Sequence, residues 1–542
     1  MSKRNYNVFF HLHTVSGIVI TVGLFVIFFA GAFTMFFSEI ETWERSRERH
    51  IAVPQPPTGA AIDLDRLVQE LEEKGYDLYG RDIYIDMLAP GPLQPFFLAA
   101  SEDSLATGEA KEYKDLQLNR ETYEVEELSR KPATTLGSLL YDLHFFYQLG
   151  DVGYYLSGLV SLFFLFAMVT GVIVHWKKII ANFYLFRPYE KLKTVWTDAH
   201  TALGVIGIPF QFMYAITGAW FGLGILVATS GALLYDGDQS AYYEALHGHR
   251  HEEHLGQRVS MNDYSLNALV DSATSKWQGL NLTYIALHGT ASTDMTLNIY
   301  GDIDSKLRLF NFGELEFDVI SGRINHMHDP YHKGYDEVVS AFIHRIHFGY
   351  FSLEGWQDIA VKMLYFLLAI ATCFVIITGV LIWLEARNKK NIPEKKRKFN
   401  QAVGHIYLAV CLSMLPVTAL SFLVTKLLPQ HLDEYSGTVI NSIFFGSWLL
   451  VSVFFWLKRD NYLTNKYTLL SAGILGCFIP LANGVVSGNW FWWTVGNGQH
   501  ELFVIDMLWL ILAALSFITV YALKGRSVNS KQRRSHVETR IK

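Results

Sequence analysis

Eight long apolar segments constrain the fold of this 542-residue chain more than any other feature of its sequence. A helix needs about 20 apolar residues to cross the hydrocarbon core of a bilayer, which is about 30 Å thick. Segments of this kind occupy residues 13–37, 150–175, 199–230, 357–384, 403–427, 440–457, 467–490 and 502–523. We therefore predict an all-α polytopic membrane protein with about eight transmembrane helices. The first segment is too long for a signal peptide, so we expect it to remain uncleaved.

The basic residues predict the orientation of these helices. Lys and Arg gather before the first segment, after the second, fourth and sixth, and in the tail at 527–542. Because cytoplasmic loops carry an excess of Lys and Arg, we expect both termini in the cytoplasm. The predicted transmembrane regions are 1–37, 146–176, 199–230, 351–385 and 403–526, with cytoplasmic loops at 177–198 and 386–402 and long extracytoplasmic segments at 38–145 and 231–350.

Each long extracytoplasmic segment has about 100 residues, enough for one small domain. The first is expected to form a helix at 62–74 and strands at 82–87, 95–100 and 113–118. The second is expected to form a helix at 265–277 and strands at 282–287, 295–300, 306–312 and 315–319. A helix followed by antiparallel strands predicts a small α+β domain in each segment. The repeated order indicates an internal duplication.

The transmembrane segments carry the same duplication. The first and third share the pattern His-x3-Gly-x13-Gly-Ala, which begins at His13 and at His200. The second and fourth are preceded by His144 and His347, and each contains Thr-Gly-Val further along. We therefore predict a core of two plus two helices followed by four C-terminal helices. The repeat places two histidines at each face of the membrane.

Paired histidines of this kind favour a haem site. A polar side chain within a membrane is costly and indicates function, although an imidazole near a helix end can also simply reach water. Haem iron accepts imidazole nitrogen axially, and helical bundles build such sites from facing helices. The neighbouring glycines would admit a macrocycle or permit tight helix packing; they are Gly17, Gly31, Gly204 and Gly218. We predict one haem between His13 and His200 and another between His144 and His347, which together would carry electrons across the bilayer.

Several short motifs resemble those of one membrane protein family. They are His13-Thr-Val-Ser-Gly17, Leu143-His144, Thr170-Gly171, Asp198-Ala-His200-Thr-Ala-Leu-Gly204, His347-Phe-Gly349, Thr378-Gly379, Asn119-Arg-Glu-Thr-Tyr-Glu-Val and Phe317-Asp-Val-Ile-Ser-Gly322. In order and spacing they look like the PepSY-associated transmembrane proteins, over about residues 5–390. That family includes haem-containing ferric-siderophore reductases of the bacterial inner membrane. The resemblance implies two b-type haems on the four histidines and two extracytoplasmic PepSY-like domains.

Two further histidines offer alternative ligands. His175 ends the second apolar segment at the cytoplasmic face, where it could replace His13 or His200. It has no histidine at its repeat position, so a plain interfacial role is the other interpretation. His344 lies three residues before His347 and could be the outer ligand in its place.

Other polar residues suggest additional sites. His405 and His500 open the fifth and eighth segments and could bind a third haem or lie at the interface. Asp506 could handle protons or lie in the headgroup region. Alternating histidines in the second outer segment could bind copper, iron or zinc, or form a solvated loop; they are His247, His249, His251 and His254, followed by His326, His328 and His332.

Composition and motifs exclude several classes of function. A net charge of −6 with only 18% charged residues argues against nucleic-acid binding. The three cysteines form no Cys-x-x-Cys, so a thiolate metal site or a disulfide framework is not expected. The chain has neither a Walker lysine motif nor a Gly-x-Gly-x-x-Gly after a strand, so we expect no nucleotide site. Electrons would therefore come from a membrane quinol or a cytoplasmic reductase.

These observations together predict a di-haem electron-transfer protein of the bacterial inner membrane. Its expected acceptor is a ferric siderophore or another ferric chelate in the periplasm, which would make it a haem-dependent oxidoreductase in iron acquisition. Two alternatives remain open. One is a non-enzymatic PepSY envelope protein that binds or regulates a peptidase, and the other is a metal transporter.

Overall fold

The computed structural model describes residues 2–46, 62–87, 93–100, 112–127, 135–184, 186–187, 190–238, 255–277, 279–303, 312–332, 334–351, 353, 355–429 and 435–539. The chain divides into two compact units. The helical unit comprises Met1–Arg49, Pro132–Ser230 and Ile346–Lys542, and the sheet unit comprises His50–Lys131 and Gly231–Arg345.

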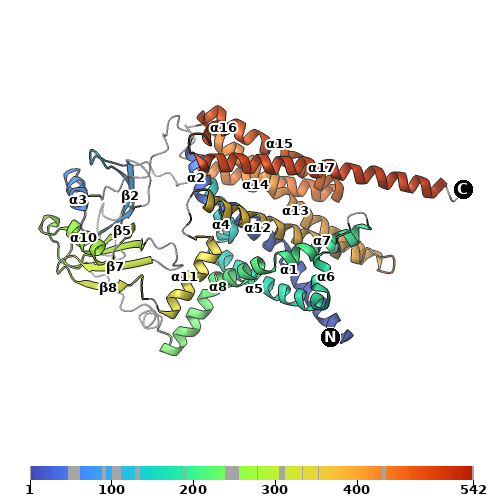
Figure 1. Cartoon of the computed structure of the whole chain (residues 1–542), viewed down its shortest axis with the longest axis horizontal. Coiled ribbons are helices and arrows are strands. Elements are labelled where there is room, and N and C mark those ends of the chain that lie inside the picture. The colour runs from blue at the N-terminus through green and yellow to red at the C-terminus, as the bar shows by residue number, and fades with distance from the viewer. Residues whose placement is uncertain are drawn as a thin grey trace. The chain divides into compact units, whose positions relative to one another are not determined.

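Within the described residues, seven helices are each long and apolar enough to cross a bilayer. They are α1 (Lys3–Thr34), α5 (Asp151–His175), α12 (Trp356–Arg387), α13 (Glu394–Leu427), α14 (Ser436–Lys458), α15 (Asn461–Ser487) and α17 (His500–Thr539). Large apolar side chains stay exposed along them, such as Leu449 and Leu450, as expected for helices that face lipid. This confirms a largely helical, multi-pass membrane protein. Figure 1 shows α13 to α17, in orange and red, alongside α1, α5 and α12.

The third predicted span, residues 199–230, is a broken helix rather than a continuous one. Residues 199–230 divide between α7 (Leu192–Ile206) and α8 (Ile208–Ala232), and the two parts are bent by 70°. Gly207 ends α7 by donating its N–H to the Leu203 carbonyl, 2.9 Å away. Pro209 follows in the first turn of α8, where its missing N–H costs nothing. His200 therefore lies on α7, before the break.

Short helices carry His144 and His347, which we predicted to lie just before spanning helices. His144 is the last residue of α4 (Thr135–His144), and His347 lies in the last turn of α11 (Tyr335–Phe348). Backbones with positive φ follow each, at Phe146 (φ 61°) and at Gly349 (φ 69°). These turns end the short helices and redirect the chain. The remaining short helices of this unit are α2 (Phe37–Arg45), α6 (Ile179–Phe183) and α16 (Phe491–Thr494).

The C-terminal helices share one hydrophobic core with α1 and α12. Phe33 of α1 stacks on Trp509 of α17 with ring centroids 5.6 Å apart. Phe422 of α13 lies 5.0 Å from the same tryptophan ring. All three side chains are fully buried. Aromatic pairs at this separation add to the stability gained from burial, so they bind the last four spans to the repeated core.

The described residues of the sheet unit form eight antiparallel strands in the order β4-β3-β2-β1-β5-β6-β7-β8. The first four are β1 (Arg81–Asp86), β2 (Leu93–Ala100), β3 (Lys114–Asn119) and β4 (Val125–Glu127). The others are β5 (Leu280–His288), β6 (Thr296–Ile303), β7 (Phe312–Asp318) and β8 (Ile324–His328). The short strands β4 and β8 were not predicted, and most of the strand expected at 306–312 lies outside the described residues.

The two outer segments build one sheet instead of two separate domains. β1 pairs with β5 in the middle, with Ile83 opposite Leu287 and Ile85 opposite Ile285. Each half adds one helix, α3 (Leu64–Glu73) in the first and α10 (Leu266–Lys276) in the second. Apolar residues from both halves form one core. The repeated order of helix and strands was foreseen, but the pairing across about 200 residues was not.

The helix N-termini in the sheet unit cap each other. Asp63 accepts a hydrogen bond from the Arg66 N–H, 3.0 Å away, as the N-cap of α3. The Asn267 amide of α10 donates to the same carboxylate at 2.6 Å, and its oxygen accepts the Leu64 N–H at 2.9 Å. Capping bonds satisfy backbone donors that a helix leaves unpaired. They therefore hold α3 and α10 together.

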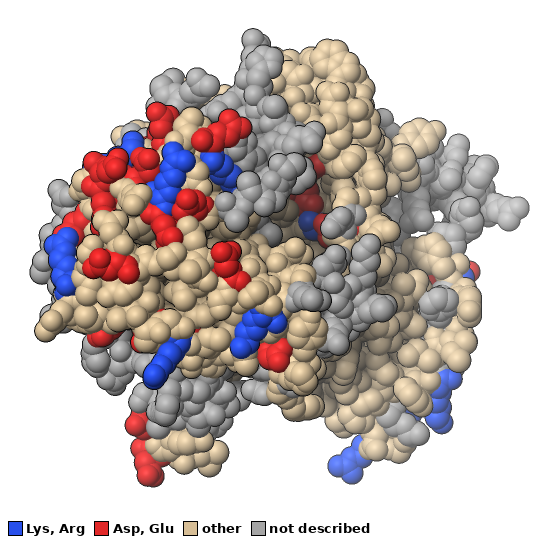
Figure 2. All heavy atoms as spheres, turned by 60° about the vertical axis from the view of Figure 1, so that its left-hand side comes forward, with Lys and Arg blue, Asp and Glu red and all other residues tan. Residues whose placement is uncertain are grey.

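Figure 2 shows Asp and Glu side chains, with some Lys and Arg, gathered over the sheet unit, whereas most of the described helix surface on the face in view is uncharged. This contrast agrees with spans that face lipid and a sheet unit that faces water.

Candidate functional site

The structure brings His13 of α1 and His200 of α7 together. Their ring centroids lie 6.2 Å apart, with the ring planes at 69°. His13 donates from Nδ1 to the carbonyl of Ala167 on α5, 2.8 Å away. His200 donates in the same way to the carbonyl of Val375 on α12, at 2.9 Å. We call these two histidines the inner pair.

The Thr-Gly motifs of α5 and α12 explain how this pair is held. Thr170 donates to the Ala167 carbonyl, which His13 also uses, and Gly171 leaves room for the ring of His13. A Cβ added at Gly171 would lie 3.0 Å from His13 Cε1. Thr378 and Gly379 repeat this arrangement around Val375 and His200, with the added Cβ at 3.4 Å from the ring. The duplicated sequence therefore produces a duplicated site.

Asp198, two residues before His200, anchors the start of α7. It is buried and accepts hydrogen bonds from Nε and Nη2 of Arg187, each 2.9 Å away. Bidentate pairing of this kind fixes geometry as well as charge. The Asp198-Ala-His200 motif thus combines an anchor with the inner-pair histidine.

The structure also brings His144 of α4 and His347 of α11 together. Their ring centroids lie 6.1 Å apart, and we call them the outer pair. His144 donates from Nδ1 to the carbonyl of Ile27 on α1, 2.8 Å away. Gly31 gives its ring space, because a Cβ there would lie 2.6 Å from His144 Cε1 and Nδ1.

His347 departs from the repeat because it bonds to a side chain. Its Nδ1 lies 2.7 Å from the Thr217 hydroxyl oxygen, which itself donates to the Met213 carbonyl at 2.9 Å. The Thr217 oxygen therefore accepts from His347 Nδ1. The Tyr214 hydroxyl donates to the His347 carbonyl at 2.8 Å. Neither Thr217 nor Tyr214 was singled out in the sequence, because Ala30 stands at the repeat position of Thr217.

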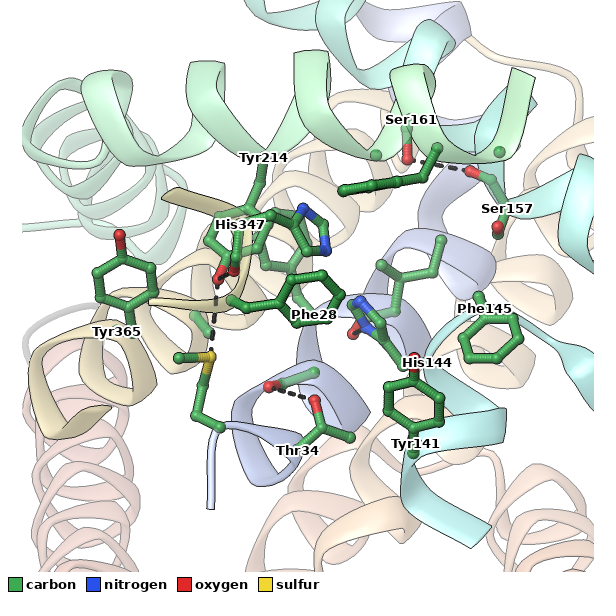
Figure 3. A pocket seen from close by; sticks show the side chains of 18 of the residues that line it. Phe28, Thr34, Tyr141, His144, Phe145, Ser157, Ser161, Tyr214, His347 and Tyr365 are labelled. Carbon is green, nitrogen blue, oxygen red and sulfur yellow. Dashed lines mark hydrogen bonds between the residues drawn. The ribbon is translucent and has the colours of Figure 1, made fainter. Parts of the chain in front are cut away.

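A cavity of about 550 Å³ surrounds the outer pair. Figure 3 shows His144 and His347 reaching into it from different elements, with Phe28 beside them and Tyr141 and Tyr365 on its walls. Cavities of about 300–1,000 Å³ are typical of small-molecule and cofactor sites. Much of the remaining lining is aromatic or small, including Phe164, Phe210, Gly218 and Gly222.

The ring separation in both pairs is compatible with two imidazoles that share one metal ion. Histidine ligands to metals donate one ring N–H to a second group, which leaves the other nitrogen to bind. All four histidines do this through Nδ1, so each Nε2 is the candidate ligand atom. Imidazole nitrogen lies about 2.0–2.1 Å from a first-row metal ion, so two rings on opposite sides of one ion have centroids about 6 Å apart. The observed 6.2 and 6.1 Å fit a haem iron between each pair.

The two pairs lie at different depths in the helical unit. His13 and Ile27, whose carbonyl accepts from His144, are fourteen residues apart on α1. At 1.5 Å per residue this separates the two levels by about 21 Å. A group between each pair would therefore bring two redox centres within one bilayer thickness.

The two alternative ligands lie in different surroundings. His175 is the last residue of α5, and its ring lies near that of His13. His344 is exposed and donates to the Ser340 carbonyl of its own helix at 2.8 Å. His347, not His344, lines the cavity.

The structure does not bring His405 and His500 together. His405 bonds to Asn461 at 2.7 Å, whereas the ring of His500 lies 4.6 Å from that of Trp356. Asn461 begins α15 and Trp356 begins α12, and these helices start at opposite membrane faces in the predicted topology.

The histidines considered for a separate metal site do not form one in the part of the chain that the structure describes. No group of three or more potential ligands is found there. His326 and His328 lie with ring centroids 4.5 Å apart, and His332 pairs with Asp329 at 3.0 Å. His247, His249, His251 and His254 lie outside the described residues.

Asp506 is part of a buried polar cluster. It accepts from the Trp43 indole and the Asn483 amide, each 2.9 Å away. Lys426 lies 4.1 Å above the Trp43 ring and donates to the Trp43 carbonyl and the Ser46 hydroxyl. Asp506 is fully buried among these protein groups.

Comparison with known protein families agrees with this architecture. The sequence profile described as PepSY-associated TM region matches residues 10–386. The matched span contains both histidine pairs and both halves of the sheet unit, and it ends before α13 begins. No curated protein matches the sequence significantly. Because the profile covers more than half of the chain, it confirms the resemblance found in the sequence: the protein belongs to the PepSY-associated TM region family.

Proposed function

We propose that this protein is an inner-membrane electron-transfer protein that binds two b-type haems, one at the inner pair and one at the outer pair. The observation that carries the proposal is the common geometry of the pairs, with ring centroids 6.2 and 6.1 Å apart and every Nδ1 committed to a hydrogen bond. When bound, haem supplies a centre that accepts and releases one electron.

The chain's own residues fix the character of these centres. Each pair supplies two imidazoles, so an iron held there would have two protein nitrogen ligands. Such a site favours electron transfer over binding of oxygen or substrate at the metal. The Nδ1 bonds fix the ring orientation and tautomer.

The proposed acceptor is a ferric siderophore or another ferric chelate in the periplasm. Fe(III) takes one electron and becomes Fe(II), which hard oxygen ligands hold less tightly. The donor would be a membrane quinol or a cytoplasmic reductase, and the electron would pass from the inner to the outer pair. This assignment places both termini in the cytoplasm and the sheet unit, as two PepSY-like halves, in the periplasm of a bacterial cell.

An absorption spectrum of the purified protein tests the proposal. We expect a Soret band and sharp reduced α-bands, and stepwise loss of haem when the inner pair and then the outer pair are changed to alanine. His344→Ala is the matched control, since His344 is exposed and should leave the spectrum unchanged. A ferric chelate should oxidise the reduced protein. A colourless protein, or a reduced one that ferric chelates do not oxidise, would contradict the proposal.

A further inference from the structure

The outer cavity has one Lys or Arg among its described lining residues, Lys362 of α12. The side chain is 10% exposed. Its ammonium donates to Glu39 Oε1 at 2.7 Å and lies 2.8 Å from Asp358 Oδ2. The other Glu39 oxygen accepts from the Ser38 hydroxyl at 3.0 Å. Lys362 is therefore held firmly in the cavity wall.

The ammonium still has a hydrogen-bond donor to offer. Lysine carries three N–H donors, and the two carboxylates use one each. Buried donors almost always find partners. Asp358 is a quarter exposed, so water screens part of its charge, and the third N–H of the ammonium can donate to a further oxygen acceptor.

We propose that Lys362 donates to a propionate carboxylate of the haem at the outer pair. This inference rests on the proposed function and assigns the residue that orients the cofactor. Haem b has an apolar macrocycle and two carboxylates, which are its charged peripheral groups. The cavity offers matching surfaces, with aromatic rings such as Phe28, Phe164 and Phe210 for the macrocycle and Lys362 for a carboxylate. Glu39 and Asp358 position the ammonium.

Reconstitution with two forms of the cofactor tests this assignment. The full chain carrying His13→Ala and His200→Ala, which keeps only the outer pair, is stripped of haem and titrated with haem b or with its dimethyl ester. The ester cannot accept a charge-assisted bond, so it should bind about 10- to 100-fold more weakly than haem b. Lys362→Met should weaken the binding of haem b by a similar factor and abolish the preference for haem b over the ester. Lys362→Arg should keep the preference.

A second variant acts in the opposite direction. Glu39→Gln keeps a hydrogen-bonding side chain but removes a competing negative charge, so the preference for haem b over the ester should rise. Lys458→Met is the control, because Lys458 is an exposed lysine at the end of α14 that does not line the cavity. The preference should not change in that variant.

The outcomes separate this inference from the proposed function. If Lys362→Met prefers haem b over the ester as strongly as the unmodified outer site does, Lys362 does not hold a propionate, although the haem assignment stands. If the chain binds neither cofactor at either pair, both proposals fail.

Discussion

Adding one methyl group at Gly31 is the most direct test of the outer pair. Its missing side chain leaves the space that the His144 ring occupies, 2.6 Å from an added Cβ. Gly31→Ala should displace the ring, break its bond to the Ile27 carbonyl and weaken the outer haem about tenfold or more. Haem titration should show loss at the outer pair, while the inner pair keeps its spectrum.

Gly446→Ala provides the matched control for this substitution. Gly446 lies in α14 and an added Cβ would meet no atom within 4 Å. Alanine is the better helix former, so this variant should be neutral or slightly more stable. Equal haem loss in both variants would show that the Gly31 effect is general to helix glycines.

Thr217 provides a second test of the outer pair, which removes a hydrogen bond instead of crowding a ring. Thr217→Val keeps the shape of the side chain but removes the acceptor for His347 Nδ1. Loss of such a supporting bond typically costs 10- to 100-fold in metal affinity, so we expect a loss of about that size at the outer pair. Thr217→Ser restores the hydroxyl and should restore binding. Failure of serine to rescue would mean that the methyl group, not the bond, matters.

At the level of single elements, α3 depends on a charged cap. The Arg66 N–H and the Asn267 amide, which bond to Asp63, lower the pKa of its carboxyl. Because the folded pKa is lowered, the stabilisation is present above the usual carboxyl pKa of about 3.9 and is lost as the pH falls through the folded value. Asp63→Ala should therefore destabilise α3 by about 1 kcal/mol at pH 7.

Hydrogen exchange of the α3 amides measures this effect. At pH 7 the variant should exchange faster than the unmodified protein, and the ratio of the two rates should approach one as the pH falls through the pKa of Asp63 in the folded protein. Asp63→Asn keeps a capping side chain, so α3 should lose less stability at pH 7 than in Asp63→Ala. A ratio that stays constant with pH would contradict a role for the carboxylate charge.

The elements also show what the sequence could predict. Long apolar runs require nothing beyond local composition, so the spanning helices were predicted well. The break at Gly207 was missed because a hydropathy window averages over the Gly-Ile-Pro triplet. The strand pairing of Ile83 with Leu287 joins residues about 200 apart, and local patterns carry no such information.

The histidine pairs could be predicted in part, unlike the spanning helices, which were predicted well, and the strand pairing, which was missed. Identical spacing in the two repeats singled out His13 and His200, and the duplication implied how they meet. Their hydrogen-bond partners depend on how the helices pack, so the carbonyls of Ala167 and Val375 could not be foreseen. Thr217 was missed because it breaks the repeat that revealed the other residues.

At the scale of the whole molecule, the C-terminal helices lie beyond the family match but contribute buried charges to the same unit. Asp506 and Lys426 are both fully buried and both contact Trp43 of α2. Asp506→Leu removes the carboxylate that accepts hydrogen bonds from the Trp43 indole and the Asn483 amide. A buried donor left without its acceptor costs about 1–3 kcal/mol, so α13 to α17 should detach from α1 and α2 more readily.

The half-life of the purified protein at a fixed elevated temperature measures this loss, because large membrane proteins unfold irreversibly. Asp506→Leu should shorten it strongly, Asp506→Asn should shorten it less, and Leu515→Ala, at an exposed position of the same helix, should leave it nearly unchanged. Before unfolding, the haem spectrum should be the same in all three, since Asp506 lines neither the outer cavity nor the inner-pair contact. If the α-bands shift in Asp506→Leu while the half-life does not fall, the C-terminal helices act on the redox centres and not as a structural support.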